Sequence, residues 1–142
     1  MTAVMIESGH LGPVEIDDDS VIEFPAGIIG FPDQRRYAII AAEETGVYSW
    51  LQSLDQPDLA FLALVPAPFF PDYAPVIPDE DCRSIGLTDP ADAQVLCLVT
   101  VGDDVITANL LGPIVLNVRN RKARQVVLTD SSLSTKAPVL EL

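Results

Sequence analysis

The stretch "PIVLNVRNRKARQVVL", residues 113–128, carries the clearest signal for the fold. Its apolar side chains alternate with other residues on both sides of a basic cluster: Ile114, Leu116 and Val118 before it, Val126 and Leu128 after it. Alternation with a period of two is typical of β-strands that bury one face. We therefore predict a β-hairpin with the basic residues at its tip.

The same alternation predicts how the two strands pair. A loop of three residues, Asn120 to Lys122, would pair Ile114 with Leu128, Leu116 with Val126, and Asn117 with Gln125. A register shifted by one residue would put Leu116 against Gln125 and break the apolar face, whereas shifts of two residues remain open.

Short runs rich in Val, Ile, Tyr and Phe, bounded by Gly, Pro or Asp, continue this pattern along the chain. They predict strands near 3–8, 13–16, 20–24, 37–42, 47–54, 60–65, 94–101, 105–110, 113–118 and 124–129. One segment, "PDEDCRSIGL" (78–87), predicts a short helix near 79–86, because acidic residues open it and Gly86 can end it. The chain is therefore expected to be all-β, either as an antiparallel barrel or as a tightly closed sandwich.

Composition limits the possible functions. Hydrophobic residues make up 49% of the 142 residues, and the net charge is −13. This charge repels polyanions at long range and favours basic partners. The first ten residues show no signal peptide and the apolar runs are too short for a membrane span, so the cytoplasm is the expected compartment. Cys82 and Cys97 are expected to be reduced, buried thiols.

Four of the eight basic residues fall in the cluster: Arg119, Arg121, Lys122 and Arg124. They form either a solvated hairpin tip or a small positive patch for an acidic partner surface. RNA is the least favoured ligand, because no aromatic residue that could stack on bases follows Tyr73.

Signals for catalysis and metal binding are weak. His10 is the single histidine and lies in an expected turn, and the run Asp17, Asp18 and Asp19 lacks the spacing of a calcium loop. Catalytic, metal-binding and cofactor-binding residues are therefore not expected. Gln52 lies in a run that is unusually polar for a core strand. The run is explained either by a core hairpin anchored by Trp50, or by a Gln52 amide at a partner surface or in a buried polar network.

Four segments together resemble the FliW family of flagellar assembly factors. They are "FPAGIIGF" (24–31), "WLQSLDQPDLAF" (50–61), "PDYAPVIPDED" (71–81) and "TANLLGPIVLNVRNRKARQVVL" (107–128). Within them Phe24, Pro25, Gly27, Ile28, Gly30 and Phe31 match one family motif; Trp50, Leu51, Gln52, Ser53, Ala60 and Phe61 match a second; Thr107, Asn109, Leu110, Pro113, Ile114 and Asn117 match a third. The chain departs from the family at its end, where Leu133–Val139 lacks the usual aromatic and histidine.

The resemblance implies a single β-barrel domain over residues 1–142, with an extended tail from about residue 131. It implies a protein without enzyme activity or cofactor that binds flagellin before export and, alternately, the carbon storage regulator CsrA, a dimeric RNA-binding repressor of translation. Binding the regulator would relieve repression of flagellin mRNA. Direct contact with nucleic acid or membrane is not implied, and a monomer is expected.

Two groups of residues are candidates for partner binding. The first is acidic and is assigned to the regulator: Asp79, Glu80, Asp81, Asp103 and Asp104. The second is assigned to partners generally: Gln52, Asn117, Arg119, Arg121 and Lys122. The alternatives to partner switching are a barrel that binds a small molecule and a protein that binds RNA directly.

Overall fold

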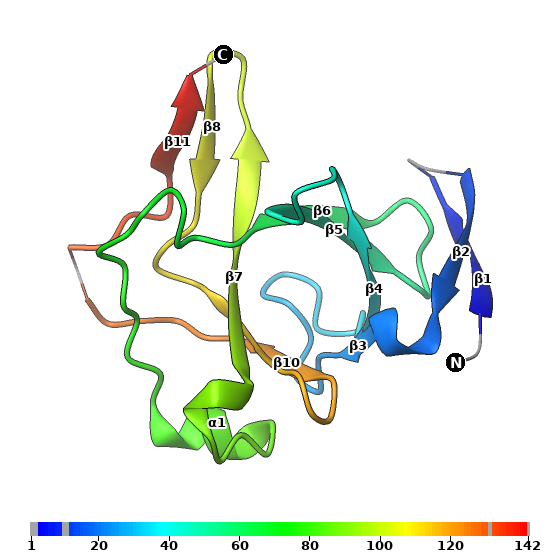
Figure 1. Cartoon of the computed structure of the whole chain (residues 1–142), viewed down its shortest axis with the longest axis horizontal. Coiled ribbons are helices and arrows are strands. Elements are labelled where there is room, and N and C mark those ends of the chain that lie inside the picture. Colours follow the sequence, from blue (N-terminus) through cyan, green and yellow to red (C-terminus); the bar gives the residue numbers. More distant parts are fainter. Residues whose placement is uncertain (1–2, 10–11, 131, 142) are drawn as a thin grey trace.

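A closed ring of seven strands forms the centre of the protein (Figure 1). The structure, a computed structural model, describes residues 3–9, 12–130 and 132–141. The ring strands are β3 (Val21–Glu23), β4 (Arg36–Ala41), β5 (Tyr48–Ser53), β6 (Ala60–Leu64), β7 (Ala93–Val101), β9 (Ile114–Asn117) and β10 (Lys122–Gln125). Neighbouring strands are antiparallel, except for β3 and β10, which run parallel, and β9 closes the ring on β7. The expected all-β barrel is confirmed.

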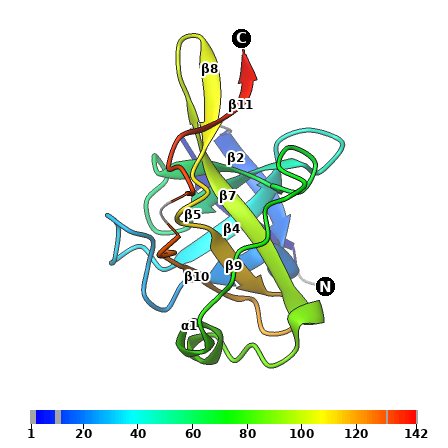
Figure 2. The same cartoon turned by 90° about the vertical axis from the view of Figure 1, so that its left-hand side faces the viewer.

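Four further strands lie outside the ring. β8 (Val105–Ala108) pairs with the second half of β7, and β11 (Ala137–Glu141) pairs with β8. β1 (Ala3–Ser8) and β2 (Gly12–Asp17) form a separate hairpin. Figures 1 and 2 show β8, β11 and the end of β7 projecting from one end of the molecule, with the helix at the opposite end. The strand β11 lies in the segment that was expected to be only an extended tail.

The predicted helix is confirmed as α1 (Asp79–Ser84). It stops because Gly86 takes a left-handed conformation, with φ of +66°. The Gly86 N–H then donates to the Arg83 carbonyl and the Leu87 N–H to the Cys82 carbonyl, which is the usual way of ending a helix on glycine. Two short 3-10 turns, Asp18–Ser20 and Pro90–Asp92, complete the helical elements of the described residues. None of these helices has the length and apolar character that crossing a membrane requires.

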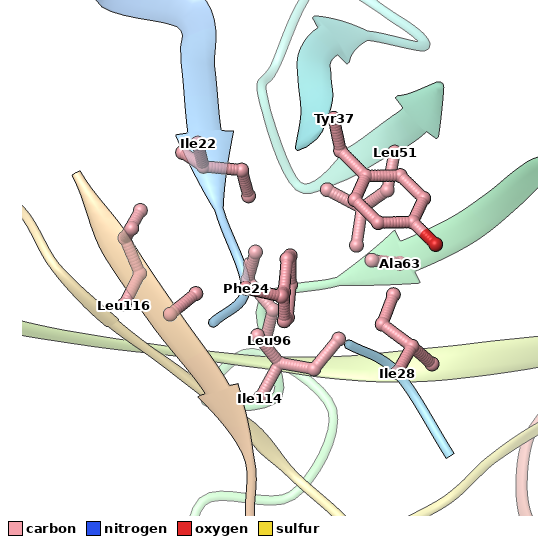
Figure 3. Close-up of a cluster of buried hydrophobic side chains, with 10 residues drawn as sticks. Ile22, Phe24, Ile28, Tyr37, Leu51, Ala63, Leu96, Ile114 and Leu116 are labelled. Carbon is pink, nitrogen blue, oxygen red and sulfur yellow. The ribbon is translucent and has the colours of Figure 1, made fainter. Parts of the chain in front are cut away.

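Buried side chains fill the inside of the ring (Figure 3). The ten residues of this cluster are Ile22, Phe24, Ile28, Tyr37, Leu51, Ala63, Leu96, Ile114, Leu116 and Ala123. The loop after β3 runs inside the ring in Figure 1 and carries Ile28 into this core. It turns so tightly that a Cβ on Gly27 would lie 2.6 Å from the Pro32 Cα atom, so only glycine fits there.

The register predicted for the 113–128 hairpin is wrong. Its turn has four residues, 118–121, and the strand pairs are Asn117 with Lys122, Leu116 with Ala123, Val115 with Arg124 and Ile114 with Gln125. The prediction assumed one buried face, but β9 is buried on both. Leu116 faces the ring interior, whereas Val115 packs with Ile85 in a second cluster beneath α1.

Candidate protein-binding surface

The helix α1 and the β9–β10 turn meet at one end of the molecule. The Asn117 and Asn120 side-chain amides both donate to the Ile85 carbonyl, at 3.0 and 2.9 Å. Asp81 accepts from the Arg124 Nε at 2.5 Å. The acidic and basic residues that the sequence analysis assigned to different roles are therefore neighbours here.

Two of the four clustered bases are paired with carboxylates. Arg124 forms its ion pair with Asp81, and Arg119 forms one with Asp92 at 2.9 Å. Lys122 is exposed, and Arg121 is half-buried in a left-handed conformation with φ of +62°. The hairpin tip is in water, as expected, but its positive charge is partly neutralised by nearby carboxylates.

The two predicted amide residues are buried. Gln52 is 0% exposed; its amide donates to the carbonyls of Ser53, Pro57 and Leu59, and its Oε1 accepts from the Ser8 hydroxyl. This is the buried polar network, one of the explanations that the sequence left open. Asn117, 3% exposed, holds the end of α1 against the turn. Both side chains are therefore inside the fold rather than on its surface.

The acidic candidates divide into two groups. Asp79 and Glu80 are exposed on the first turn of α1, and Asp81 is half-buried in its ion pair. Asp103 and Asp104 are exposed in the turn between β7 and β8, at the opposite end of the molecule (Figures 1 and 2). One small contact surface cannot include both groups.

An exposed apolar patch, not predicted from the sequence, lies beside α1. We call the side chains of Ile29 and Val127 the apolar patch. Ile29 and Val127 are 61% and 62% exposed and line one recess of about 430 Å³, together with Asp81 and Arg124. Phe31 is 38% exposed and packs edge-on against Phe61. Large aliphatic side chains gathered on a surface mark protein-binding sites.

Hydrogen bonds hold this patch in place. The Ile29 N–H donates to the Gln125 Oε1 at 3.0 Å, and the Gln125 amide donates to the Gly112 carbonyl at 3.1 Å. The loop that carries Ile29 is thus tied to β10, and Ile28 anchors it in the core. The patch is therefore presented on a rigid support, which lowers the entropy that binding must offset.

Groups suited to metal binding do not gather within the described ranges. No cluster of three or more His, Cys, Asp or Glu side chains among them could hold a metal ion. The expected structural histidine, His10, lies outside the described residues. Cys97 is buried, and burial raises the pKa of its thiol to about 11, which makes it a poor nucleophile.

Comparison with known proteins agrees with this geometry. A family model described as FliW protein matches residues 5–139. The flagellar assembly factor FliW of Natranaerobius thermophilus is 39% identical over 137 residues, covering 94% of this chain and 91% of that protein. That of Leptospira interrogans serovar Lai is 33% identical over 141 residues, covering 97% and 94%. A crystal structure of the flagellar assembly factor FliW superposes with a TM-score of 0.88 at 31% identity, covering 96% of this chain and 97% of the other.

Proposed function

This chain belongs to the FliW family of flagellar assembly factors, and from that premise we propose that it is a non-catalytic binding protein with two alternating partners, flagellin and the translational regulator CsrA. The proposed setting is the cytoplasm, where flagellin is made before export. Capture of the regulator relieves repression of flagellin mRNA, and an excess of flagellin displaces the regulator.

Flagellin is the proposed partner of the apolar patch. The exposed Ile29 and Val127 in one recess are the observation that carries this assignment. Water contact makes such a patch costly for the free protein. Burying the exposed three fifths of each residue against a partner recovers about 1–2 kcal/mol. The ion pair of Asp81 with Arg124 in the same recess is locally neutral, so it favours an apolar segment over a charged one.

The regulator is the proposed partner of the acidic face of α1. An RNA-binding protein presents Lys and Arg to phosphates, and Asp79 and Glu80 offer exposed charge of the opposite sign on a molecule with a net charge of −13. Asp103 and Asp104 remain a second acidic candidate at the other end of the molecule. The exposed bases Arg119 and Lys122 remain candidates for an acidic part of either partner.

The position of α1 supports alternation between the partners. Asp81 lines the recess of the apolar patch, and Asp79 and Glu80 lie on the same short helix. Partners on these adjoining surfaces interfere, so each weakens the other by the same coupling free energy. The filled interior of the ring gives the alternative of a small-molecule-binding barrel no support.

A competition experiment tests the proposal. Fluorescently labelled regulator is bound to the protein and titrated with flagellin, and release is followed by anisotropy. The double variant Ile29→Ser, Val127→Ser should bind flagellin at least about tenfold more weakly, because a tenfold change in Kd corresponds to roughly 1.4 kcal/mol. Val101→Ser is the matched control, because Val101 is also 60% exposed but lies in the projecting part of β7. Equal flagellin binding by both variants contradicts the assignment of the patch.

A further inference from the structure

A second apolar recess, distinct from the patch, adjoins α1. It is a groove of about 520 Å³ between the proline-rich segment, the loop after α1 and the start of β7, lined chiefly by Pro75, Ile77, Leu87 and Val95, with Asp79 and Asp89 also in its wall. Asp79 and Cys82 line this groove, whereas Asp81 lines the recess of the patch. Residues three apart share a helix face, so α1 presents one face to each recess.

We propose that this groove binds a segment of a partner protein that presents an apolar side chain next to a lysine or arginine. The inference rests on the proposed function in one respect: of the two proposed partners, the RNA-binding regulator is the one whose basic surface fits. The groove then supplies an apolar anchor for a contact that the charge of α1 alone would leave weak and salt-sensitive.

The charges around the groove favour a positively charged partner segment. Its lining contains the carboxylates of Asp79 and Asp89 and no basic side chain. Asp89 uses one oxygen to accept from the Ala91 N–H at 2.9 Å, and a carboxylate has further sites to accept from a cation. The neighbouring carboxylates of Asp81 and Asp92 are already paired with Arg124 and Arg119. Asp79 and Asp89 are therefore the acidic groups of the groove that remain for a partner's base.

Other occupants fit less well. A second copy of this chain carries the same net charge of −13, and self-repulsion opposes its docking on an acidic rim. Nucleic acid is repelled for the same reason. An uncharged apolar segment would fill the groove but would leave the two carboxylates desolvated without a partner, which costs free energy.

A thiol in the groove provides a direct test. Cys82 is half-buried in the lining, whereas Cys97 is fully buried with its pKa raised to about 11, so N-ethylmaleimide should modify Cys82 first. Saturating regulator should slow this modification, followed by mass spectrometry, at least about tenfold. Saturating flagellin should leave the rate unchanged. An unchanged rate with the regulator bound, or equal protection by both proteins, would overturn the inference.

A matched pair of charge variants tests the carboxylates. Asp79→Asn with Asp89→Asn removes two charges and keeps the turn at Asp89, because asparagine caps as well as aspartate. Glu15→Gln with Asp17→Asn removes the same charge on β2, where both side chains are exposed and lie away from α1 (Figure 1). The first variant should slow association with the regulator by about 3- to 10-fold at low salt, with the loss shrinking as salt rises, and the second should slow it less. Equal slowing by both variants assigns the effect to net charge and overturns the inference.

The same measurements separate this inference from the proposed function. Binding of the regulator by the unmodified protein, with no difference between the two charge variants and no protection of Cys82, refutes the groove and leaves the proposed function standing. Failure of the unmodified protein to bind the regulator refutes both.

Discussion

The two asparagines that hold α1 allow a sharp test of how its position is stabilised. Asn117→Ala removes a hydrogen bond to the Ile85 carbonyl and one from the Arg119 N–H, both at 3.0 Å. Asn120→Ala removes the matching pair, to the same carbonyl at 2.9 Å and from the Lys122 N–H at 3.0 Å. Asn117 is buried and Asn120 is exposed. We expect Asn117→Ala to lower the free energy of unfolding by about 1–3 kcal/mol and Asn120→Ala by about 0.5–1 kcal/mol, since water replaces lost partners at the exposed site.

The double variant should lose more free energy of unfolding than the two single variants lose together. Either asparagine alone still satisfies the Ile85 carbonyl, and Ile85 is 2% exposed. Removing both leaves a buried acceptor without these donors, which adds about 1–2 kcal/mol. Urea unfolding of the four proteins at one temperature gives the coupling free energy. A coupling of zero, or a double variant less destabilised than the sum, would refute the reasoning that one carbonyl depends on both amides.

Three further predictions concern the barrel and its loops. Tyr37→Phe should raise the free energy of unfolding by about 1 kcal/mol, because the buried Tyr37 hydroxyl has no hydrogen-bond partner; a less stable variant in urea would show that the hydroxyl has an acceptor. Leu116→Ala should lower the free energy of unfolding by about 2–5 kcal/mol, because Leu116 is fully buried in the ring, whereas Val127→Ala at an exposed position should lower it little. Equal losses of the two variants in urea would contradict the burial of Leu116 in the core. Glu43 accepts from the Thr45 hydroxyl and from backbone N–H groups, which lowers its pKa from 4.5 to about 2. The stability that the ionised carboxylate contributes is therefore present above pH 4.5 and is lost as the pH falls through 2, so the melting temperature of Glu43→Gln should fall less between pH 5 and pH 2 than that of the unmodified protein. Parallel falls in the two melting temperatures would argue against the hydrogen-bonded carboxylate.

Short-range sequence signals predicted much of the fold. Acidic residues before "CRSIG" predicted α1, and Gly86 ends it through the left-handed conformation expected there. The hairpin register was missed for two reasons. The strand β9 is buried on both faces, so the alternation did not fix the pairing, and Arg121, rather than glycine, takes the positive φ of the turn, which the sequence does not signal. The strand β11 was missed because Pro138 argues against a central strand, and the structure places it on a strand beyond β8, outside the ring.

The candidate surface was less predictable than the fold. In "GIIG" one isoleucine must face the core, but local pattern cannot say that Ile28 is buried and Ile29 exposed. The ion pair of Asp81 with Arg124 joins residues far apart in the chain, so the sequence did not predict that carboxylates partly neutralise the basic cluster. The role of Gln52 stayed open because its hydrogen-bond partners include Ser8, which is distant in the chain, as well as the nearby carbonyls of Pro57 and Leu59.

The parallel pairing of β3 with β10 affects how the barrel is made in the cell. It joins Glu23 to Lys122, and contacts between such distant residues form slowly because a long loop must close first. The meander from β3 to β6 can pair as soon as it leaves the ribosome, since its strands follow one another in sequence. Until the residues beyond 113 emerge, however, the sheet stays open, with unpaired edges and its inner apolar face in water. The nascent chain is therefore most prone to aggregate during this interval.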